Sequence, residues 1–236
     1  MEEEIDWDQE AENWTKWART PGHDAYWYYR DRFFDEIVPP AGRCTVELGC
    51  GEGRVVRDLQ KRGHRVVAID RSRRLLRYAK ESDPDGLYLI ANAARLPLTD
   101  ASCDLVVAYN SLMDVADLPT TVSEAARILE PGGRICVCVT HPLSNAGNFV
   151  NSESGSAFHI SETYFGRRNF EGTFERDGLT MTFRGWSMAL EDYTRTFEGA
   201  GLLLEALREP QPSDTTARFA AWHRMPMFLT MRLVKP

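Results

Sequence analysis

A glycine-rich turn carries the most chemically informative residues of this 236-residue chain. The turn reads Glu47-Leu48-Gly49-Cys50-Gly51-Glu52-Gly53 and follows a short apolar run. Glycines let a backbone approach a ligand closely and adopt conformations that a Cβ forbids. A second apolar run ends in Asp70, about 20 residues further on, whose carboxylate can accept two hydrogen bonds from a ribose diol. This order of strand, glycine turn, helix and strand-end carboxylate predicts a nucleotide-type binding unit.

The spacing of the glycines and the charge beside them indicate the kind of ligand. A dinucleotide-binding turn favours Gly-x-Gly-x-x-Gly, whereas Gly53 here comes one residue earlier. Glu47 stands just ahead of the turn, where its negative charge would oppose a diphosphate and favour a positively charged ligand. These features argue against a nicotinamide-dependent oxidoreductase.

Three further motifs follow the glycine turn in a fixed order. Residues 92–98 (Asn-Ala-Ala-Arg-Leu-Pro-Leu) are similar to Asp-Ala-x-x-Leu-Pro-Phe, residues 102–108 to a strand written Phe-Asp-x-Val, and residues 129–134 to Leu-x-Pro-Gly-Gly. Together the four motifs resemble the class I S-adenosylmethionine-dependent methyltransferases over residues 44–140. The closest resemblance is to the small-molecule branch that includes the ubiquinone and menaquinone methyltransferases. Asn92 and Cys103 depart from the family's Asp and Phe.

The resemblance implies S-adenosylmethionine as cofactor and S-adenosylhomocysteine as product. This cofactor carries a sulfonium and an ammonium and has no phosphate, which suits a carboxylate beside the turn. Asp70 is expected to hold the ribose hydroxyls, and the side-chain carbonyl of Asn92 can still accept a hydrogen bond from the adenine amine. The cofactor-binding residues implied are Glu47, Gly49, Cys50, Gly51, Gly53, Asp70, Arg71, Asn92, Ala93, Asn110 and Ser111.

The acceptor side is less determined, because methyl transfer from a sulfonium depends mainly on positioning and desolvation. A general base is needed only when the acceptor must lose a proton that is not already acidic. His141 follows the fifth expected strand, at the sheet edge where such folds bind ligands, and is our candidate catalytic base. It could equally contact the acceptor without proton transfer or serve only the fold. The expected acceptor contacts are Tyr26, Tyr29, Asp114, His141, His159 and Tyr164.

Alternating strands and helices must position these residues. Apolar periodicity predicts two aromatic-rich helices over about residues 5–19 and 24–38, ahead of the glycine turn. The regular alternation after them predicts a parallel sheet covered on both faces, whose strands are buried on both sides. Strands are expected at 44–48, 65–69, 87–90, 104–108, 134–139, 202–208 and 226–234, with helices at 53–62, 72–81, 119–130 and 188–199, the last capped by Ser187.

The expected fold is a Rossmann-like, doubly wound α/β sheet of seven strands, mostly parallel with an antiparallel last strand. We divide the chain into an N-terminal helical lid (1–40), a cofactor-binding core (41–140), an inserted substrate cap (141–186) and the C-terminal part of the core sheet (187–236). The segment 141–186 is too long for a plain connection, so it is functional or partly disordered. Aromatic residues of the lid and cap could shield an apolar acceptor or simply pack.

Composition narrows the partners and the location. The net charge of −7 argues against broad nucleic-acid binding, which needs phosphate-neutralising Lys and Arg. Five cysteines show neither metal-ligand spacing nor a disulfide framework, so we expect no metal and a reducing, cytoplasmic location. The acidic N-terminus is unlike a targeting peptide, and no apolar run approaches the roughly 20 residues that span a bilayer.

The sequence therefore predicts a methyltransferase that acts on a small, largely apolar or aromatic acceptor. Oxygen is the favoured methylated atom, followed by nitrogen or carbon. The alternative is a cofactor-binding regulatory protein on the same fold, without turnover of its own. Formation of S-adenosylhomocysteine separates the two hypotheses.

Overall fold

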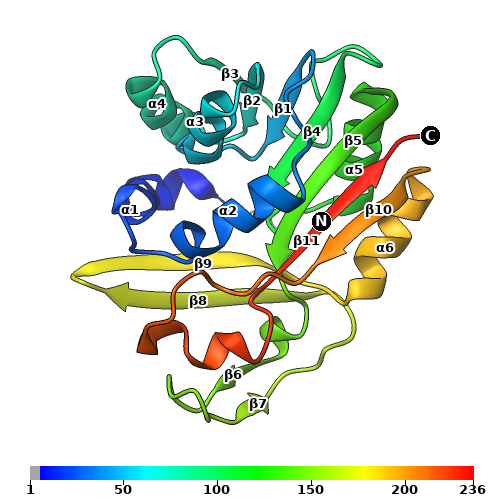
Figure 1. The fold of residues 1–236 in the computed structure, drawn as a ribbon. Helices are drawn as coiled ribbons and strands as arrows, with labels where there is room; N and C mark the ends of the chain where they lie inside the picture. Colours follow the sequence, from blue (N-terminus) through cyan, green and yellow to red (C-terminus); the bar gives the residue numbers. More distant parts are fainter. Residues whose placement is uncertain (1–5) are drawn as a thin grey trace.

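Seven strands form the central sheet of the computed structural model, which describes residues 6–236 (Figure 1). Their order is β10-β11-β5-β4-β1-β2-β3, and β11 runs antiparallel to both of its neighbours whereas the pairs among β1–β5 are parallel. The strands are β1 Thr45–Leu48, β2 Val66–Asp70, β3 Leu87–Ile90, β4 Cys103–Tyr109, β5 Leu129–Thr140, β10 Leu203–Arg208 and β11 Phe228–Val234. This confirms the predicted seven-stranded, mostly parallel α/β fold.

The chain reverses its winding between β1 and β4, which are neighbours in the sheet. In open α/β sheets, ligands bind outside the carboxyl ends of the strands at such a point. The turns that follow β1, β2 and β4 all lie at this edge. The fold therefore brings the glycine turn, Asp70 and the residues after β4 together.

Helices cover both faces of the sheet, as predicted. α2 (Tyr26–Glu36) and α3 (Arg54–Lys61) pack on one face through apolar side chains such as Phe33 and Leu59. α5 (Leu118–Ile128) and α6 (Leu190–Gly199) pack on the other face, through apolar side chains such as Val122 and Phe197. α4 (Arg73–Ser82) begins after Ser72, whose hydroxyl accepts a hydrogen bond from the Leu75 N–H.

Two local expectations are wrong. Ser187 does not cap α6; it ends a strand, and the Asp192 carboxylate accepts from the Ala189 N–H at the start of that helix. β3 is not buried on both sides, because it is the outermost strand and pairs only with β2. Its Leu87 and Ile90 are 63% and 50% exposed.

Residues 141–186 fold as two antiparallel hairpins rather than as a plain connection. β6 (Gly147–Phe149) pairs with β7 (Phe158–Ile160), and the longer β8 (Arg168–Arg176) pairs with β9 (Leu179–Ser187). In Figure 1 the β8–β9 hairpin lies across the carboxyl ends of the central strands, beneath α1 (Trp7–Arg19) and α2. The hairpin and α1 therefore cover the edge of the sheet where a ligand is expected.

The remaining expectations about the chain's organisation can be placed on this fold. α1 matches the first predicted helix, whereas residue 5 and the acidic residues 2–4 lie outside the described residues. Between β10 and β11 the chain forms a loop with two short 3-10 helices, Ala217–Phe219 and Ala221–His223. All five cysteines are free. Within residues 6–236, none of the helices is both long and apolar enough to cross a membrane.

Candidate cofactor and acceptor site

A cavity of about 790 Å³ opens at the carboxyl ends of the central strands. It extends from the glycine turn, past the residues that follow β4, to the inner side of the β8–β9 hairpin. Among the residues predicted from the sequence, its wall contains Tyr26, Glu47, Gly49, Cys50, Gly51, Asp70, Arg71, Asn92, Ala93, Asn110, Ser111 and Asp114. The structure thus brings together predicted residues from the glycine turn, the end of β2 and the segments that follow β3 and β4.

Glycine is required at position 49 for two reasons. Its φ of +70° lies in the left-handed region, and a Cβ there would collide with the Cβ of Ser111. The Ser111 hydroxyl donates to the Leu48 carbonyl oxygen at 2.6 Å, so the ends of β1 and β4 are held against each other. Gly53 stands outside the cavity wall; with φ +84° it precedes the first residue of α3.

Asp70 organises the next turn. Its Oδ2 accepts from the Gly51 N–H and its Oδ1 from the Ser72 N–H, both at 2.8 Å. Burial raises the pKa of this carboxyl, against the lowering effect of these backbone hydrogen bonds. A carboxylate offers about four lone-pair sites on its two oxygens, so Asp70 can still accept a hydrogen bond from a diol in the cavity.

Glu47 is an unpaired buried carboxyl group in the cavity wall. Glu47 is 2% exposed, and its Oε2 has no hydrogen-bond partner among residues 6–236. Burial is the main cause that raises its pKa, and the neighbouring charges of Asp70 and Glu52 add to the effect. Because an uncompensated buried charge is costly, the site favours a ligand that brings a cation or a hydrogen-bond donor to Glu47.

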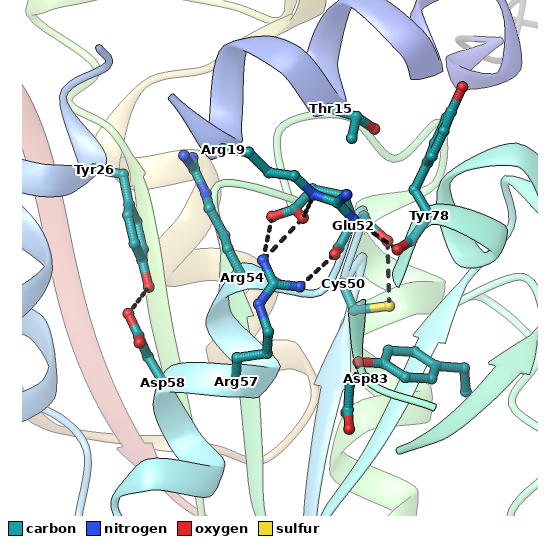
Figure 2. A network of polar contacts seen from close by, with 12 residues as sticks. Thr15, Arg19, Tyr26, Cys50, Glu52, Arg54, Arg57, Asp58, Tyr78 and Asp83 are labelled. Atoms are coloured by element: carbon teal, nitrogen blue, oxygen red, sulfur yellow. Dashed lines mark hydrogen bonds and ion pairs between the residues drawn. The ribbon is translucent and has the colours of Figure 1, made fainter. Parts of the chain in front are cut away.

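A polar network ties α1 to the glycine turn (Figure 2). Arg19 reaches down from α1 and donates to the Glu52 carboxylate at 2.7 Å and to the Tyr78 carbonyl oxygen at 2.6 Å. Glu52 is 1% exposed and also pairs with Arg57 at 2.9 Å. At the other end of α1, the Asp8 carboxylate accepts from the Ser72 hydroxyl, just beyond Asp70. The helix is therefore fastened near both turns of the cofactor half.

Arg54 places a positive charge in the same half of the cavity. Its guanidinium pairs with Asp24 at 2.6 Å and lies 4.8 Å from the ring centroid of Trp14 and 4.2 Å from that of Tyr26. Sequence reasoning missed Arg54, Glu52 and Asp24, although Glu52 stands between two glycines of the turn and Arg54 directly follows the last one. Arg54 can meet the carboxylate of an amino-acid ligand.

Two asparagines fill predicted positions in different ways. The side chain of Asn92 is exposed, and its Oδ1 accepts from the Ala94 N–H at 2.9 Å, which shapes the turn after β3. Asn110 has φ +52°, and its N–H donates to the Cys138 carbonyl oxygen at 2.8 Å. The buried Oδ1 of Asn110 has no hydrogen-bond partner in the described part of the chain. Both residues lie in the cavity wall.

His141 is not in the cavity wall. Its Nδ1 accepts from the Leu143 N–H at 3.1 Å, so the proton lies on Nε2, which donates to the Glu209 carboxylate at 2.9 Å. Burial lowers the pKa of the imidazole. Both ring nitrogens are engaged in holding the chain at the end of β5, and this geometry does not support a base role.

Three other predicted acceptor residues also lie away from the cavity wall. Tyr29 is buried between the rings of Phe219 and Phe228. His159 is exposed on β7, and the Tyr164 hydroxyl accepts from the Leu190 N–H at the start of α6. Of the predicted acceptor contacts, the structure places Tyr26 and Asp114 in the wall.

The acceptor half of the wall combines aromatic and polar side chains. Its aromatic members include Phe170, Phe174, Phe183 and Trp186 of the β8–β9 hairpin. Two arginines of the hairpin form ion pairs, Arg184 with Glu171 at 2.9 Å and Arg168 more loosely with Glu162 at 3.9 Å, whereas Arg176 donates to the His23 carbonyl oxygen at 2.6 Å. This half suits a mainly aromatic acceptor that also makes polar contacts.

Comparison with known proteins agrees with this geometry. Residues 46–137 match the family model of the methyltransferase domain. An uncharacterized methyltransferase of Mycobacterium tuberculosis is 34% identical over 107 residues, which are 45% of this chain and 44% of that protein. A demethylmenaquinone methyltransferase of Tropheryma whipplei is 26% identical over 207 residues, 80% of this chain and 83% of the relative. The crystal structure of an S-adenosylmethionine dependent methyltransferase from Mesorhizobium loti superposes with a TM-score of 0.66 at 23% identity, covering 89% of this chain and 98% of that one.

The fold is that of the S-adenosylmethionine dependent methyltransferase from Mesorhizobium loti, and the glycine turn lies within the part of the chain that matches the methyltransferase domain. More narrowly, residues 46–137 match the methyltransferase domain, and the relatives that the chain resembles include a demethylmenaquinone methyltransferase and a probable S-adenosylmethionine-dependent methyltransferase. The match spans less than half of the mycobacterial relative, 44% of its length. The unpaired Glu47 and the glycine turn fit a cofactor that has an ammonium and no phosphate.

Proposed function

We propose that the protein transfers a methyl group from S-adenosylmethionine to a small acceptor and releases S-adenosylhomocysteine. The observation that carries this proposal is the buried, unpaired carboxyl of Glu47 beside a glycine turn that Asp70 braces. A carboxylate there matches the cationic methionine half of the cofactor, whereas it would repel a diphosphate.

The residues of the cofactor half have distinct roles in this proposal. Glu47 faces the ammonium, Arg54 meets the carboxylate, and Asp70 accepts from the ribose hydroxyls. Asn92 and Ala93 border the adenine, with Arg71 beside it, while Gly49, Cys50 and Gly51 provide backbone next to the ligand. Gly53 sets the start of α3, and Asn110 and Ser111 border the methionine. When bound, S-adenosylmethionine supplies a methyl group already activated on sulfur, so the protein's work is alignment and exclusion of water.

The acceptor in this proposal is a small, mainly aromatic molecule that enters beneath the β8–β9 hairpin. Phe170, Phe183 and Trp186 form apolar wall there, and Tyr26 borders the cofactor half. O-methylation is favoured, with N- or C-methylation as alternatives. His141, Tyr29, His159 and Tyr164 have no place in this proposal, because they lie away from the cavity wall.

Two broader expectations remain part of the proposal. The excess of acidic residues, with a net charge of −7, supports a small-molecule acceptor over a nucleic acid. Five free cysteines support a reducing compartment such as the cytoplasm.

Isothermal titration of the purified protein with S-adenosylhomocysteine tests the cofactor assignment. We expect one-to-one binding in the micromolar range and no binding of NAD under the same conditions. Saturable NAD binding without S-adenosylhomocysteine binding would refute the assignment. S-adenosylhomocysteine formation with a panel of small aryl alcohols and amines then tests turnover, and binding without turnover for every acceptor would favour the regulatory alternative.

A further inference from the structure

Asp114 stands out in the acceptor half as a carboxyl group that the fold does not use. It lies in the loop after β4, where its backbone N–H donates to the Ser111 carbonyl oxygen at 3.0 Å, and its side chain lines the cavity. No hydrogen bond or ion pair joins its carboxylate to another of residues 6–236. The paired hairpin charges of the same half, such as Arg184 with Glu171, contrast with this isolation.

The position of Asp114 joins the cofactor half to the acceptor half. Ser111, one turn earlier, packs against the site of Gly49 in the glycine turn. On the other side, the Trp186 N–H donates to the Met113 carbonyl oxygen at 2.7 Å, which docks β9 on this loop. Gly185 of β9 leaves room for the carboxylate, since a Cβ there would stand 3.0 Å from the Asp114 Oδ1. Asp114 therefore sits where the two ligands must meet.

The groups around Asp114 do not neutralise it. Asp70 at the end of β2 adds negative charge, and together with burial, the larger cause, it raises the pKa of Asp114 well above its ordinary range. Tyr193 of α6 faces it as a neutral phenol, whose own pKa is raised by burial and by Asp114. β9 presents Gly185, which has no charge, and the Arg167 guanidinium binds the Val115 and Ala116 carbonyl oxygens of the same loop.

We propose that Asp114 is the proton acceptor of the reaction, and that the methyl acceptor is therefore a hydroxyl or amine compound that presents an O–H or N–H to it. This inference rests on the proposed function. As the acceptor's lone pair forms the new bond to the methyl carbon, the carbon–sulfur bond breaks and its electron pair stays on sulfur. The acceptor's proton passes to the Asp114 carboxylate and then to water. A carboxylate whose proton affinity is raised by burial is the stronger base for this step.

Calorimetry can test the placement of Asp114 without a known acceptor. S-adenosylmethionine carries a positive sulfur that S-adenosylhomocysteine lacks, so it favours ionisation of a nearby carboxyl. Titration with each ligand between pH 5 and 8, in buffers of different ionisation enthalpy, gives the number of protons released on binding. We expect the wild type to release more protons with S-adenosylmethionine than with S-adenosylhomocysteine.

In Asp114→Asn this excess should fall by at least half, while S-adenosylhomocysteine affinity stays within about twofold. Asp192→Asn is the matched control, because Asp192 also lies near Tyr193 but outside the cavity wall and should leave the excess unchanged. An excess that is the same in Asp114→Asn as in the wild type would overturn the inference. If the asparagine variant loses S-adenosylhomocysteine binding, Asp114→Ser replaces it in the same comparison. Absence of binding by the wild type would instead overturn the proposed function, and this inference with it.

Turnover provides the second readout. With the panel member that the wild type methylates, Asp114→Asn should lose about a hundredfold or more in kcat, the range of general base catalysis. The wild-type rate should rise with pH as Asp114 ionises, whereas the residual rate of the variant should lack that rise. Methylated aryl alcohols indicate a hydroxyl acceptor and methylated amines an amine. A variant that turns over within twofold of the wild type at every pH would contradict the role.

Discussion

The cofactor half of the cavity is built from turns at the ends of strands, whereas the acceptor half is built largely from a hairpin and its surroundings. In the cofactor half, Glu47 is a buried carboxyl with a raised pKa, and its Oε2 has no hydrogen-bond partner among residues 6–236. In the acceptor half, hairpin charges such as Arg184 and Glu171 neutralise each other. A buried carboxyl that the fold leaves unpaired marks a place where a cation or a hydrogen-bond donor of a ligand can bind.

The largest expected effect comes from comparing one glycine from each half. Gly49 and Gly178 have φ values of +70° and +75°, but a Cβ meets the Cβ of Ser111 at Gly49 and nothing within 4 Å at Gly178. Gly49→Ala should lower the free energy of unfolding by about 3–5 kcal/mol and abolish S-adenosylhomocysteine binding, because steric overlap adds to backbone strain. Gly178→Ala should cost about 1 kcal/mol from strain alone and leave binding intact. Urea unfolding and calorimetry measure both; equal losses would break the comparison.

A pair of acidic residues should separate the two halves by affinity. Asp70→Ala should weaken S-adenosylhomocysteine binding about ten- to a hundredfold, because two hydrogen bonds from the ribose to a charged group are lost. Glu171→Ala removes a paired, exposed carboxylate of the hairpin and should leave this affinity unchanged. Calorimetric Kd values of the two variants decide the matter, and an unchanged Kd for Asp70→Ala would remove the ribose assignment.

The unpaired carboxyl of Glu47 should make stability depend on pH. Its folded pKa is raised, so the unfolded chain ionises more readily, and its contribution to stability falls as pH rises above about 4.5, the unfolded value. Glu47→Gln should therefore gain stability relative to the wild type as pH rises from 4 to 8, by about 1.4 kcal/mol for each pKa unit of the shift. Urea unfolding over that range measures the difference. A difference that stays constant with pH would show that Glu47 ionises normally in the folded protein.

Saturating S-adenosylmethionine should make the wild type more stable than Glu47→Gln, the reverse of their order without ligand at high pH. Only the wild type gains a full charge interaction with the ammonium of the cofactor, so its stability should rise more on binding. Equal stabilisation of the wild type and Glu47→Gln by the ligand would show that Glu47 does not contact the ammonium.

The smallest expected effect concerns the fastening of α1. Arg19→Ala removes one of the two cations on Glu52 and should lower the free energy of unfolding by about 1 kcal/mol, since Arg57 remains. S-adenosylhomocysteine affinity should fall a few-fold. Lys16→Ala, which breaks an exposed pair on the same helix, should change neither quantity measurably. If both variants bind S-adenosylhomocysteine alike, Arg19 does not couple the helix to the turn.

The cofactor half could be predicted well because its information is local. A glycine spacing, a strand-end Asp70 and the order of the motifs lie within short stretches of sequence, and the parallel sheet brings their ends together. The same holds for the bounds of β1, β2 and β4, which are marked by continuous apolar runs, whereas β5 begins at Leu129, five residues before the predicted strand at 134–139. β3 lies at the predicted residues 87–90, but its exposure was not predicted, because its apolar residues look like those of a buried strand.

The acceptor half was harder, because its geometry depends on distant partners. Glu209 lies 68 residues beyond His141 in sequence, so its hold on the imidazole was invisible, and His141 looked like a base. The β8–β9 hairpin had one local signal, the dipeptide Asp177-Gly178, which supplies two successive positive φ values for a tight turn. The two strands mix polar and apolar residues, so they lack the continuous apolar run by which the central strands were predicted.

The double fastening of α1 has a consequence for the rate of ligand exchange. Arg19 anchors the helix beside Glu52, and Asp8 anchors it beside Ser72, so the helix cannot swing away without releasing at least one of the two turns. Trp7, next to the Asp8 anchor, and Trp14, between the two anchors, line the cavity. The two anchors stabilise the closed position of the helix, and so does a ligand that lies beneath it. The anchors therefore slow dissociation of the ligand, and the ligand slows release of the helix. Residence time and amide-hydrogen protection of residues 7–19 should therefore rise and fall together.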